Sequence, residues 1–326
     1  MDLQVAYSSD DNYAQHVGVS MLSLFENNKE FDDIVIYILE NNISVDNKSK
    51  LSIIAKSYGR KITFTEISSL LDKISLNIGN SIAVSSYARL FLSSVVPSEV
   101  EKILYIDCDS VITNSLAELW KTDLSACYIA GVADTVSQYS ENFTEIGLQE
   151  VDMYINAGMI LIDLNKWRIN NAEQKFIDFI AQRNGKVRHH DQGTINGVLH
   201  NYCKIIHPQY NVMSVFFTMT KDQIIKYYNM NGYYYSEEEL REAIRMPVII
   251  HYTPGFVGRP WVKDCKHPLK NMYIKYLQMT PWKDVPLQKD NRKPVEKGIL
   301  FLYDNLSFNL AYRICKIAFK SLRGTT

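Results

Sequence analysis

Short apolar runs alternate with segments of helical periodicity through the first half of the chain. Four runs predict buried strands: "LQVAYSS" (3–9), "DIVIYIL" (33–39), "KITFTEI" (61–67) and "ILYI" (103–106). Three segments between them predict helices: "HVGVSMLSLFENN" (16–28), "SVDNKSKLSIIAKSYG" (44–59) and "SSYARLFLSSVVP" (85–97). Such alternation predicts an α/β fold with a mostly parallel sheet flanked by helices.

The second half is less regular. "MYINAGMILIDLNKW" (153–167) predicts a buried strand between a loop and a turn, and "NAEQKFIDFIAQ" and "HHDQGTINGVLHN" predict helices. "PVIIHYTPGFVGRPW" (247–261) predicts a strand that ends at His251, followed by a loop rich in glycine and proline. A turn-rich segment (280–298) is expected before one final helix.

Two carboxylates, Asp107 and Asp109, follow the fourth apolar run. On an extended chain, residues i and i+2 share a face and lie about 7 Å apart. Two like charges so placed repel each other unless a cation lies between them, and carboxylates are ligands for Mn²⁺ or Mg²⁺. "SSDDN" (8–12) also follows a strand, and ligands of parallel sheets bind beyond the carboxyl ends of strands.

Bulk composition narrows the class of protein. The chain has 326 residues, 46% of them hydrophobic and 22% charged, which suits a soluble protein of one large domain with additions, or of two domains. A net charge of −1 gives no case for binding nucleic acid. The five cysteines form no CxxC pair, which favours reduced thiols in the cytoplasm. We expect neither a signal peptide nor a membrane-spanning segment.

Positive charge is concentrated near the C-terminus. Residues 289–326 contain eight Lys or Arg and three acidic residues, a net charge of +5. In the last predicted helix, Arg313, Lys316, Lys320 and Arg323 recur at helical spacing beside apolar residues. A basic amphipathic helix can lie on an anionic membrane surface. The alternative is a helix packed on the domain with a solvated basic face; we favour the membrane.

Six motifs together resemble glycosyltransferase family 8, and within it the bacterial lipooligosaccharide α-galactosyltransferases. They are "SSDDNYAQHVGVS", "SSYARLFL", the Asp107-Cys108-Asp109 triplet, "YINAGMILIDLNKWR", "HHDQGTIN" and "HYTPGFVGRPW". Their order and spacing agree over residues 1–265, whereas an isolated acidic pair would usually be only solvated. The resemblance implies a GT-A (Rossmann-like) domain over 1–265 and a small helical C-terminal extension over 266–326 that carries the basic helix.

The implied activity is retaining transfer of a hexose, galactose or glucose, from a UDP-sugar to a glycan or lipid-linked acceptor, with Mn²⁺ or Mg²⁺ as cofactor. The metal ligands would be Asp107, Asp109 and His251, and an imidazole favours Mn²⁺. The alternative for His251 is a hydrogen-bonded histidine at a strand end. With a lipid-linked acceptor, the protein would be cytoplasmic and peripheral on the inner face of the plasma membrane.

The resemblance also implies a nucleotide-sugar site. Asp10 and Asn12 would contact uracil and ribose, Tyr13 the base, and Arg259, in a closing loop with Gly255, the β-phosphate. The donor sugar would meet Arg89, Asp134, Asn156 and Asp191. Arg259 replaces the family's lysine after an insertion of about two residues, and the alternative for Arg89 is a surface ion pair. The full set expected to bind the donor is Ser8, Asp10, Asn12, Tyr13, Arg89, Asp107, Cys108, Asp109, Asp134, Asn156, Ala157, Asp191, Gln192, His251, Gly255 and Arg259.

By the same resemblance, Gln192 and Asp191 are the expected catalytic residues. An amide is a poor nucleophile, so Gln192 is expected to stabilise an oxocarbenium-like transition state while the acceptor attacks from the side of the leaving UDP. Hydrolases that retain configuration use a carboxylate pair, but no carboxylate clearly occupies the nucleophile position here. A second metal site at His189, His190 and Asp191 is disfavoured, and Gly158 is expected to permit a tight turn beside Asn156.

Three alternatives stay open. The aromatic residues of 212–235 would form either a lid over the acceptor or ordinary packing. "DCDSV" also fits a haloacid-dehalogenase-type phosphatase, in which Asp107 would be the nucleophile and Asp109 the general acid. The third alternative is a non-catalytic glycan-binding protein. The intact acidic pair, His251 and Gln192 argue against it.

Overall fold

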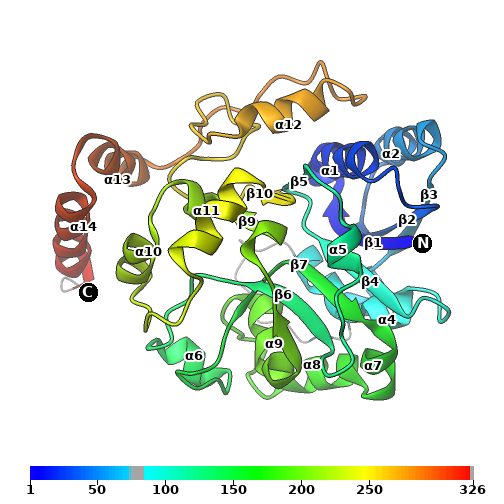
Figure 1. Cartoon of the computed structure of the whole chain (residues 1–326), viewed down its shortest axis with the longest axis horizontal. Helices are drawn as coiled ribbons and strands as arrows, with labels where there is room; N and C mark the ends of the chain where they lie inside the picture. The colour runs from blue at the N-terminus through cyan, green and yellow to red at the C-terminus, as the bar shows by residue number, and fades with distance from the viewer. Residues whose placement is uncertain (73, 75–83, 324–326) are drawn as a thin grey trace.

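A seven-stranded sheet forms the centre of the computed structural model, which describes residues 1–72, 74 and 84–323 (Figure 1). The strand order is β3-β2-β1-β4-β7-β6-β8. Every neighbouring pair is parallel except those that β7 makes with β4 and β6. The predicted mostly parallel sheet is therefore confirmed. The bounds are β1 Leu3–Asp10, β2 Ile34–Asn41, β3 Lys61–Glu66, β4 Lys102–Ile106, β6 Ile129–Ala133, β7 Ile155–Asp163 and β8 Cys203–Ile205.

Helices cover both faces of this sheet. On β4, Leu104 and Ile106 join the core on the side of α1 and α2, while Ile103 and Tyr105 join the core on the side of α7, α8 and α9. Opposite-facing neighbours on one strand explain why "ILYI" is apolar without interruption. The helices are α1 Ala14–Asn27, α2 Val45–Ser57, α7 Leu164–Ile169, α8 Ala172–Ala181 and α9 His190–Leu199.

A second, three-stranded sheet has the order β5-β10-β9 (β5 Ser110–Ile112, β9 Val212–Met213, β10 Ile249–His251). β10 is antiparallel to β5, where His251 pairs with Ser110, and parallel to β9, where it pairs with Met213. The predicted strand ending at His251 is confirmed. This small sheet brings residue 251 beside the acidic pair.

Four local predictions were wrong or incomplete. β4 ends at Ile106, so Asp107 and Asp109 lie in the turn between β4 and β5 and not on an extended strand. Segment 85–97 is a 3₁₀ helix (Val84–Phe91) followed by one turn of α-helix, α4 Leu92–Val95. The expected turn after β7 is α7, because the Asp163 side chain accepts a hydrogen bond from the Lys166 N–H (2.8 Å) and caps the helix.

The fourth lies in 280–298, where α13 already begins at Pro294. Proline is tolerated at the first helical position, and the Glu296 side chain accepts a hydrogen bond from the Lys293 N–H (2.6 Å). The proline that indicated a turn, Pro294, is in fact the first residue of a helix.

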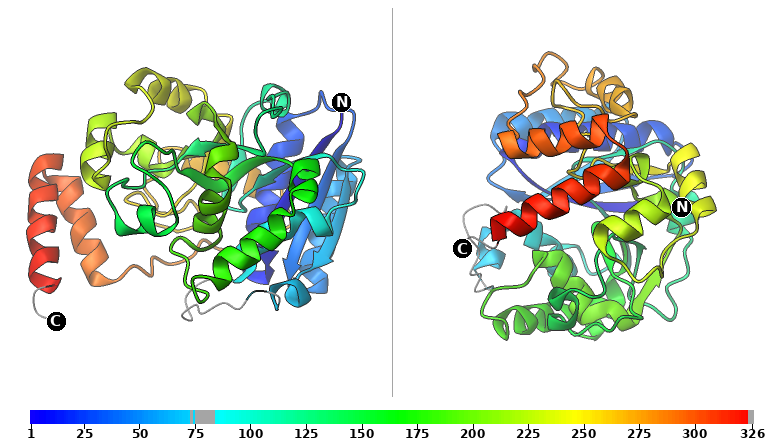
Figure 2. Two further views of the ribbon diagram at one scale, coloured as in Figure 1. Left: turned by 90° about the horizontal axis from the view of Figure 1, so that it is seen from below. Right: turned by 90° about the vertical axis from the view of Figure 1, so that its left-hand side faces the viewer.

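The C-terminal segment packs on the domain and then leaves it. α12 (Lys270–Leu277) lies against α1, where the Tyr273 hydroxyl is 2.6 Å from His16 Nδ1. α13 (Pro294–Asn305) and α14 (Phe308–Arg323) form a helical hairpin at one end of the molecule (Figure 2). The predicted final helix is confirmed as α14.

The remaining elements are short. They are α3 Ser68–Leu71, α5 Ala117–Trp120, α6 Glu141–Glu145, α10 Lys221–Tyr228, α11 Glu237–Arg245, and the 3₁₀ helices Asp11–Tyr13, His200–Tyr202, Pro208–Tyr210 and Ser214–Phe217.

Candidate active site

Asp107, Asp109 and His251 meet where the two sheets join. One ligand atom from each lies within 4.8 Å of the others. His251 Nε2 is 3.1 Å from Asp109 Oδ1 and 3.9 Å from Asp107 Oδ2. Backbone hydrogen bonds fix the turn on both sides, from the Asp107 N–H to Gly158 O (2.7 Å) and from the Tyr252 N–H to Asp109 O (2.9 Å). Two carboxylates and one imidazole are a donor set that suits Mn²⁺.

Asn211 sets the orientation of the His251 ring. Asn211 Nδ2 donates to Asn156 Oδ1 (2.9 Å), so the other end of the amide, Oδ1, faces His251 Nδ1 at 2.9 Å. Nδ1 therefore donates to Asn211 Oδ1, and Nε2 is the ring nitrogen that faces the acidic pair. Asn211 is fully buried. The sequence analysis missed it, because a lone asparagine before a two-residue strand carries no local signal.

Gly158 gives this ring its space. A Cβ atom on residue 158 would lie 2.1 Å from His251 Cε1. The expected tight turn at Gly158 was wrong, because the residue lies inside β7. Glycine is required there for the close approach of an imidazole.

A chain of amides and carboxylates connects His251 to Gln192. Asn156 Nδ2 and Gln192 Nε2 both donate to Asp134 Oδ2, at 3.0 and 2.9 Å. Gln192 Oε1 accepts from the Ala157 N–H (2.9 Å), and Asn156 Oδ1 accepts from the Gly158 N–H (2.9 Å). Each amide thus has one consistent orientation. The side chains at 192, 134, 156, 211 and 251 form one continuous polar network.

Arg89 joins two carboxylates in the interior. Its Nη2 lies 2.8 Å from Asp107 Oδ1 and its Nε 2.9 Å from Asp191 Oδ2, while Nη1 donates to Ala157 O. The guanidinium carbon lies 4.2 Å from the centre of the Tyr105 ring. Arg89 is buried, so the surface ion pair considered as its alternative was wrong. Burial raises the pKa of Asp191 even though Arg89 opposes that shift.

Arg259 reaches the acidic pair despite the insertion before it. Its Nη1 lies 2.9 Å from Asp109 Oδ2 and donates to the Tyr13 hydroxyl (3.3 Å), and its guanidinium lies over the Trp261 ring. Burial would raise the pKa of Asp109, but His251 and Arg259 outweigh it and hold that pKa below its usual value. Burial would lower the pKa of His251, and the Asp109 charge raises it instead.

Beside the end of β1 lies a cavity of about 170 Å³, lined by Ser8, Asp10, Tyr13, Cys108 and Arg259 among others. Asp10 accepts from the Tyr13 N–H (3.1 Å) and so caps the 3₁₀ turn. The Cys108 thiol donates to Ser8 O (2.9 Å), which ties the acidic turn to the end of β1. Asn12 is exposed on that turn.

A larger cavity of about 500 Å³ adjoins this one, and Arg89 and Asp107 line both. Its walls include Asp134 and Asp191, which with Arg89 were expected to meet the donor sugar, and also Ala157 and Gln192, whereas Asn156 lines a neighbouring cavity. His189 and His190 lie at its edge, with Nδ1 atoms 3.1 Å from the Tyr154 hydroxyl and 3.5 Å from the Tyr87 hydroxyl. The fold thus gathers side chains from six motifs into two joined cavities.

The aromatic segment 212–235 divides between two roles. Phe216 and Tyr235 are buried in the core, and the Tyr235 hydroxyl donates a hydrogen bond to Ile206 O (2.7 Å). Tyr227 and Tyr228 instead line a cavity beside Gly255. Packing explains the first pair, and only the second pair could meet an acceptor.

The structure thus has an α/β fold whose strands end on a cluster of two carboxylates and one imidazole, flanked by two adjoining cavities. The sequence profile of glycosyl transferase family 8 matches residues 4–265, and the chain belongs to that family. It is therefore a glycosyltransferase. This membership leaves the phosphatase alternative without support.

Two curated relatives and one solved structure describe the likeness. A putative glycosyltransferase of Haemophilus influenzae is 31% identical over 81% of this chain and 74% of its own. The lipopolysaccharide 1,2-glucosyltransferase of Escherichia coli K12 is 25% identical over 86% and 79%. The galactosyltransferase LgtC, solved with donor and acceptor sugar analogues, superposes with a TM-score of 0.70 at 21% identity over 91% and 99%. The structural likeness confirms the GT-A fold.

Proposed function

We propose that the protein transfers a hexose, galactose or glucose, from a UDP-sugar to a glycan or lipid-linked acceptor with retention of configuration and with Mn²⁺. The observation that carries this proposal is the trio Asp107, Asp109 and His251, whose member Asp107 lines both of the adjoining cavities. Two of the similar proteins named above are a glucosyltransferase and a galactosyltransferase, so glucose and galactose are both retained as candidate donor sugars.

The trio would hold the cation, since its carboxylate oxygens and His251 Nε2 converge within 4.8 Å of one another. A bound divalent cation neutralises charge on the departing diphosphate. Arg259 already lies on the acidic pair and could follow the diphosphate as its second positive partner, because guanidinium binds phosphate oxygens bidentately. The same three side chains would bind Mg²⁺ less well, because Mg²⁺ prefers oxygen donors to an imidazole nitrogen.

For a retaining transfer, the engaged carboxylates argue against a covalent glycosyl-enzyme intermediate. Asp191 pairs with Arg89, and Asp134 Oδ2 accepts two amide hydrogen bonds, so both are poor nucleophiles. We infer front-face transfer: the bond from sugar C1 to the UDP oxygen breaks, the acceptor oxygen bonds to C1 on the same face, and its proton passes to the β-phosphate. Gln192, held by Ala157 and Asp134, stabilises the positive charge that develops at C1.

We also propose that the chain divides at residue 265 into a transferase domain and an extension that meets the membrane. Exposed apolar side chains lie on the α13–α14 hairpin, including Phe301 at 65% exposure and Ile317 at 70%. Arg313 and Lys316 are exposed beside them. The side chains of Lys320 and Arg323 lie outside the described residues.

Such a surface suits an anionic bilayer on the cytoplasmic side. Within the described ranges, none of the helices combines the length and apolar character needed to cross a membrane.

A donor panel tests the proposed function. UDP-galactose, UDP-glucose, UDP-N-acetylglucosamine and GDP-mannose are incubated with Mn²⁺, and release of the nucleoside diphosphate is measured. We expect release from UDP-galactose or UDP-glucose, and its loss in Asp109→Asn. Absence of release from every donor would instead favour the non-catalytic glycan-binding alternative.

A further inference from the structure

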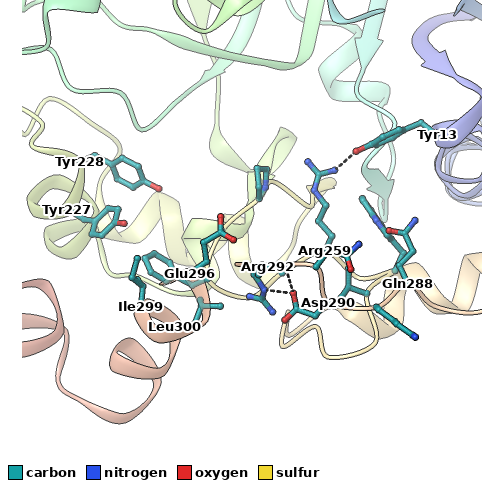
Figure 3. Close-up of a pocket in the computed structure, with 18 residues that line it drawn as sticks. Tyr13, Tyr227, Tyr228, Arg259, Gln288, Asp290, Arg292, Glu296, Ile299 and Leu300 are labelled. Atoms are coloured by element: carbon teal, nitrogen blue, oxygen red, sulfur yellow. Dashed lines mark hydrogen bonds and ion pairs between the residues drawn. The ribbon is translucent and has the colours of Figure 1, made fainter. Parts of the chain in front are cut away.

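A third cavity, of about 700 Å³, lies between the transferase domain and the C-terminal extension (Figure 3). Tyr13 and Arg259 lie on its nucleotide side, Tyr227 and Tyr228 on another side, and Arg292, Glu296 and Leu300 of the extension on a third. Neither the cation site nor the donor cavities use the extension residues. The cavity therefore has a wall whose chemistry the proposed transfer does not yet explain.

This cavity adjoins the cavities around Asp134. Tyr228 lines it, lines the donor-sugar cavity of about 500 Å³, and lines a connecting cavity of about 230 Å³. Asp134 lines the latter two. A molecule whose reacting hydroxyl lay beside Asp134 could thus extend past Tyr228 to the C-terminal wall.

The walls combine aromatic faces with groups that form hydrogen bonds. The Tyr227 ring lies edge-on to Tyr228 (5.0 Å between centroids) and to Phe256 (5.5 Å). Arg292 Nε donates to Asp290 Oδ1 (2.9 Å), and the Arg292 side chain forms part of the cavity wall. Glu296 supplies a carboxylate acceptor on the same wall.

Backbone hydrogen bonds and a ring contact join this wall to the loop that carries Arg259. The Lys263 N–H donates to Gln288 O (2.9 Å) and the Gln288 N–H to Trp261 O (2.8 Å), which forms a short parallel bridge just after Arg259. Phe256 of the loop packs on Tyr303 of α13, with ring centroids 4.7 Å apart. A ligand seated against the extension would therefore contact the loop that covers the donor.

We propose that this cavity binds the distal sugar units of an oligosaccharide acceptor, so that the C-terminal extension forms an acceptor subsite. Pyranose rings present C–H faces to aromatic rings and hydroxyl groups to guanidinium and carboxylate groups, and this wall offers both. A volume of about 700 Å³ is within the range of small-molecule sites. The inference rests on the proposed transfer to a glycan.

The test compares acceptors of increasing length. The full-length protein is assayed with Mn²⁺ and UDP-galactose or UDP-glucose against methyl galactoside, methyl glucoside, lactose, maltose, maltotriose and globotriose. We expect kcat/KM to be about tenfold higher for at least one oligosaccharide than for its monosaccharide, the value of one or two added hydrogen bonds. Glu296→Gln and Arg292→Ala should each remove most of that advantage through KM.

Two controls separate this subsite from the transfer itself. Val295→Ala, on the same helix but outside the cavity, should leave the length dependence unchanged. UDP-sugar hydrolysis without acceptor should be equal in the wild type, Glu296→Gln and Arg292→Ala; its absence in the wild type would count against the proposed function. If hydrolysis occurs but no oligosaccharide outperforms its monosaccharide, or the variants weaken both equally, the subsite does not exist.

Discussion

The donor side and the acceptor side of the site are built differently. Around His251, Asn156 and Asp134 the side chains are mostly buried, and each polar atom of the network has an assigned partner. Around Tyr227 and Arg292 the walls are half-exposed and rest on a two-bond bridge and ring contacts. In the proposed function, a pre-organised donor end performs the chemistry, whereas an acceptor end held by fewer contacts can vary. Changes at the two ends should therefore have effects of different size and kind.

The largest effect should come from Asp109→Asn. It removes one carboxylate from the cation trio and the partner of Arg259 while preserving shape. Losing several kcal/mol of charge stabilisation corresponds to a fall of about 10³-fold or more in turnover. UDP release measures it, and Asp123→Asn, on an exposed loop, is the control. Turnover within tenfold of the wild type would contradict the role of Asp109.

Gln192→Ala should come next, with a fall of about 10²-fold in kcat and little change in KM for the donor, because one positioned polar group is removed from the transition state. Gln192→Glu keeps the shape but loses the donor to Asp134. Unchanged kcat in Gln192→Ala would remove this residue from the mechanism.

Asn211→Ala should weaken the site indirectly. Loss of the acceptor for His251 Nδ1–H frees the ring to turn, which typically costs about 10–100-fold in metal affinity. The readout is the Mn²⁺ concentration for half-maximal activity, together with calorimetric Mn²⁺ titration in the presence of UDP. Recovery of activity at high Mn²⁺ would identify a positioning role; a loss that no Mn²⁺ concentration restores would contradict it.

The smallest effect concerns the outer hairpin. Arg313→Glu with Lys316→Glu should reduce binding to phosphatidylglycerol vesicles by about tenfold or more, since each basic residue near an anionic surface contributes about 1 kcal/mol. Transfer to a soluble acceptor should not change. Cosedimentation equal to that of the wild type would refute the membrane proposal, and phosphatidylcholine vesicles are the control.

The sequence predicted the site residues that lie in local motifs, and it did not predict the contacts that form only when distant segments meet in the fold. Asp107, Asp109 and His251 could be selected because each ends an apolar run and lies in a recognisable motif. Asn211 could not, because its meaning depends on His251 and Asn156, which are 40 and 55 residues away. The glycine at 158 was noticed, but its reason, an imidazole from β10, required the small sheet. α13 was hidden because Pro294 indicates a turn as readily as a helix start.

Binding of Mn²⁺ in the presence of UDP, followed by electron paramagnetic resonance, tests the account most directly, since it needs neither the right sugar nor the right acceptor. We expect the wild type to bind Mn²⁺, His251→Ala to lose at least tenfold in affinity, and Asp109→Asn to lose more. Equal Mn²⁺ affinity in all three proteins would mean that these side chains do not hold the ion, and the proposed mechanism would be wrong.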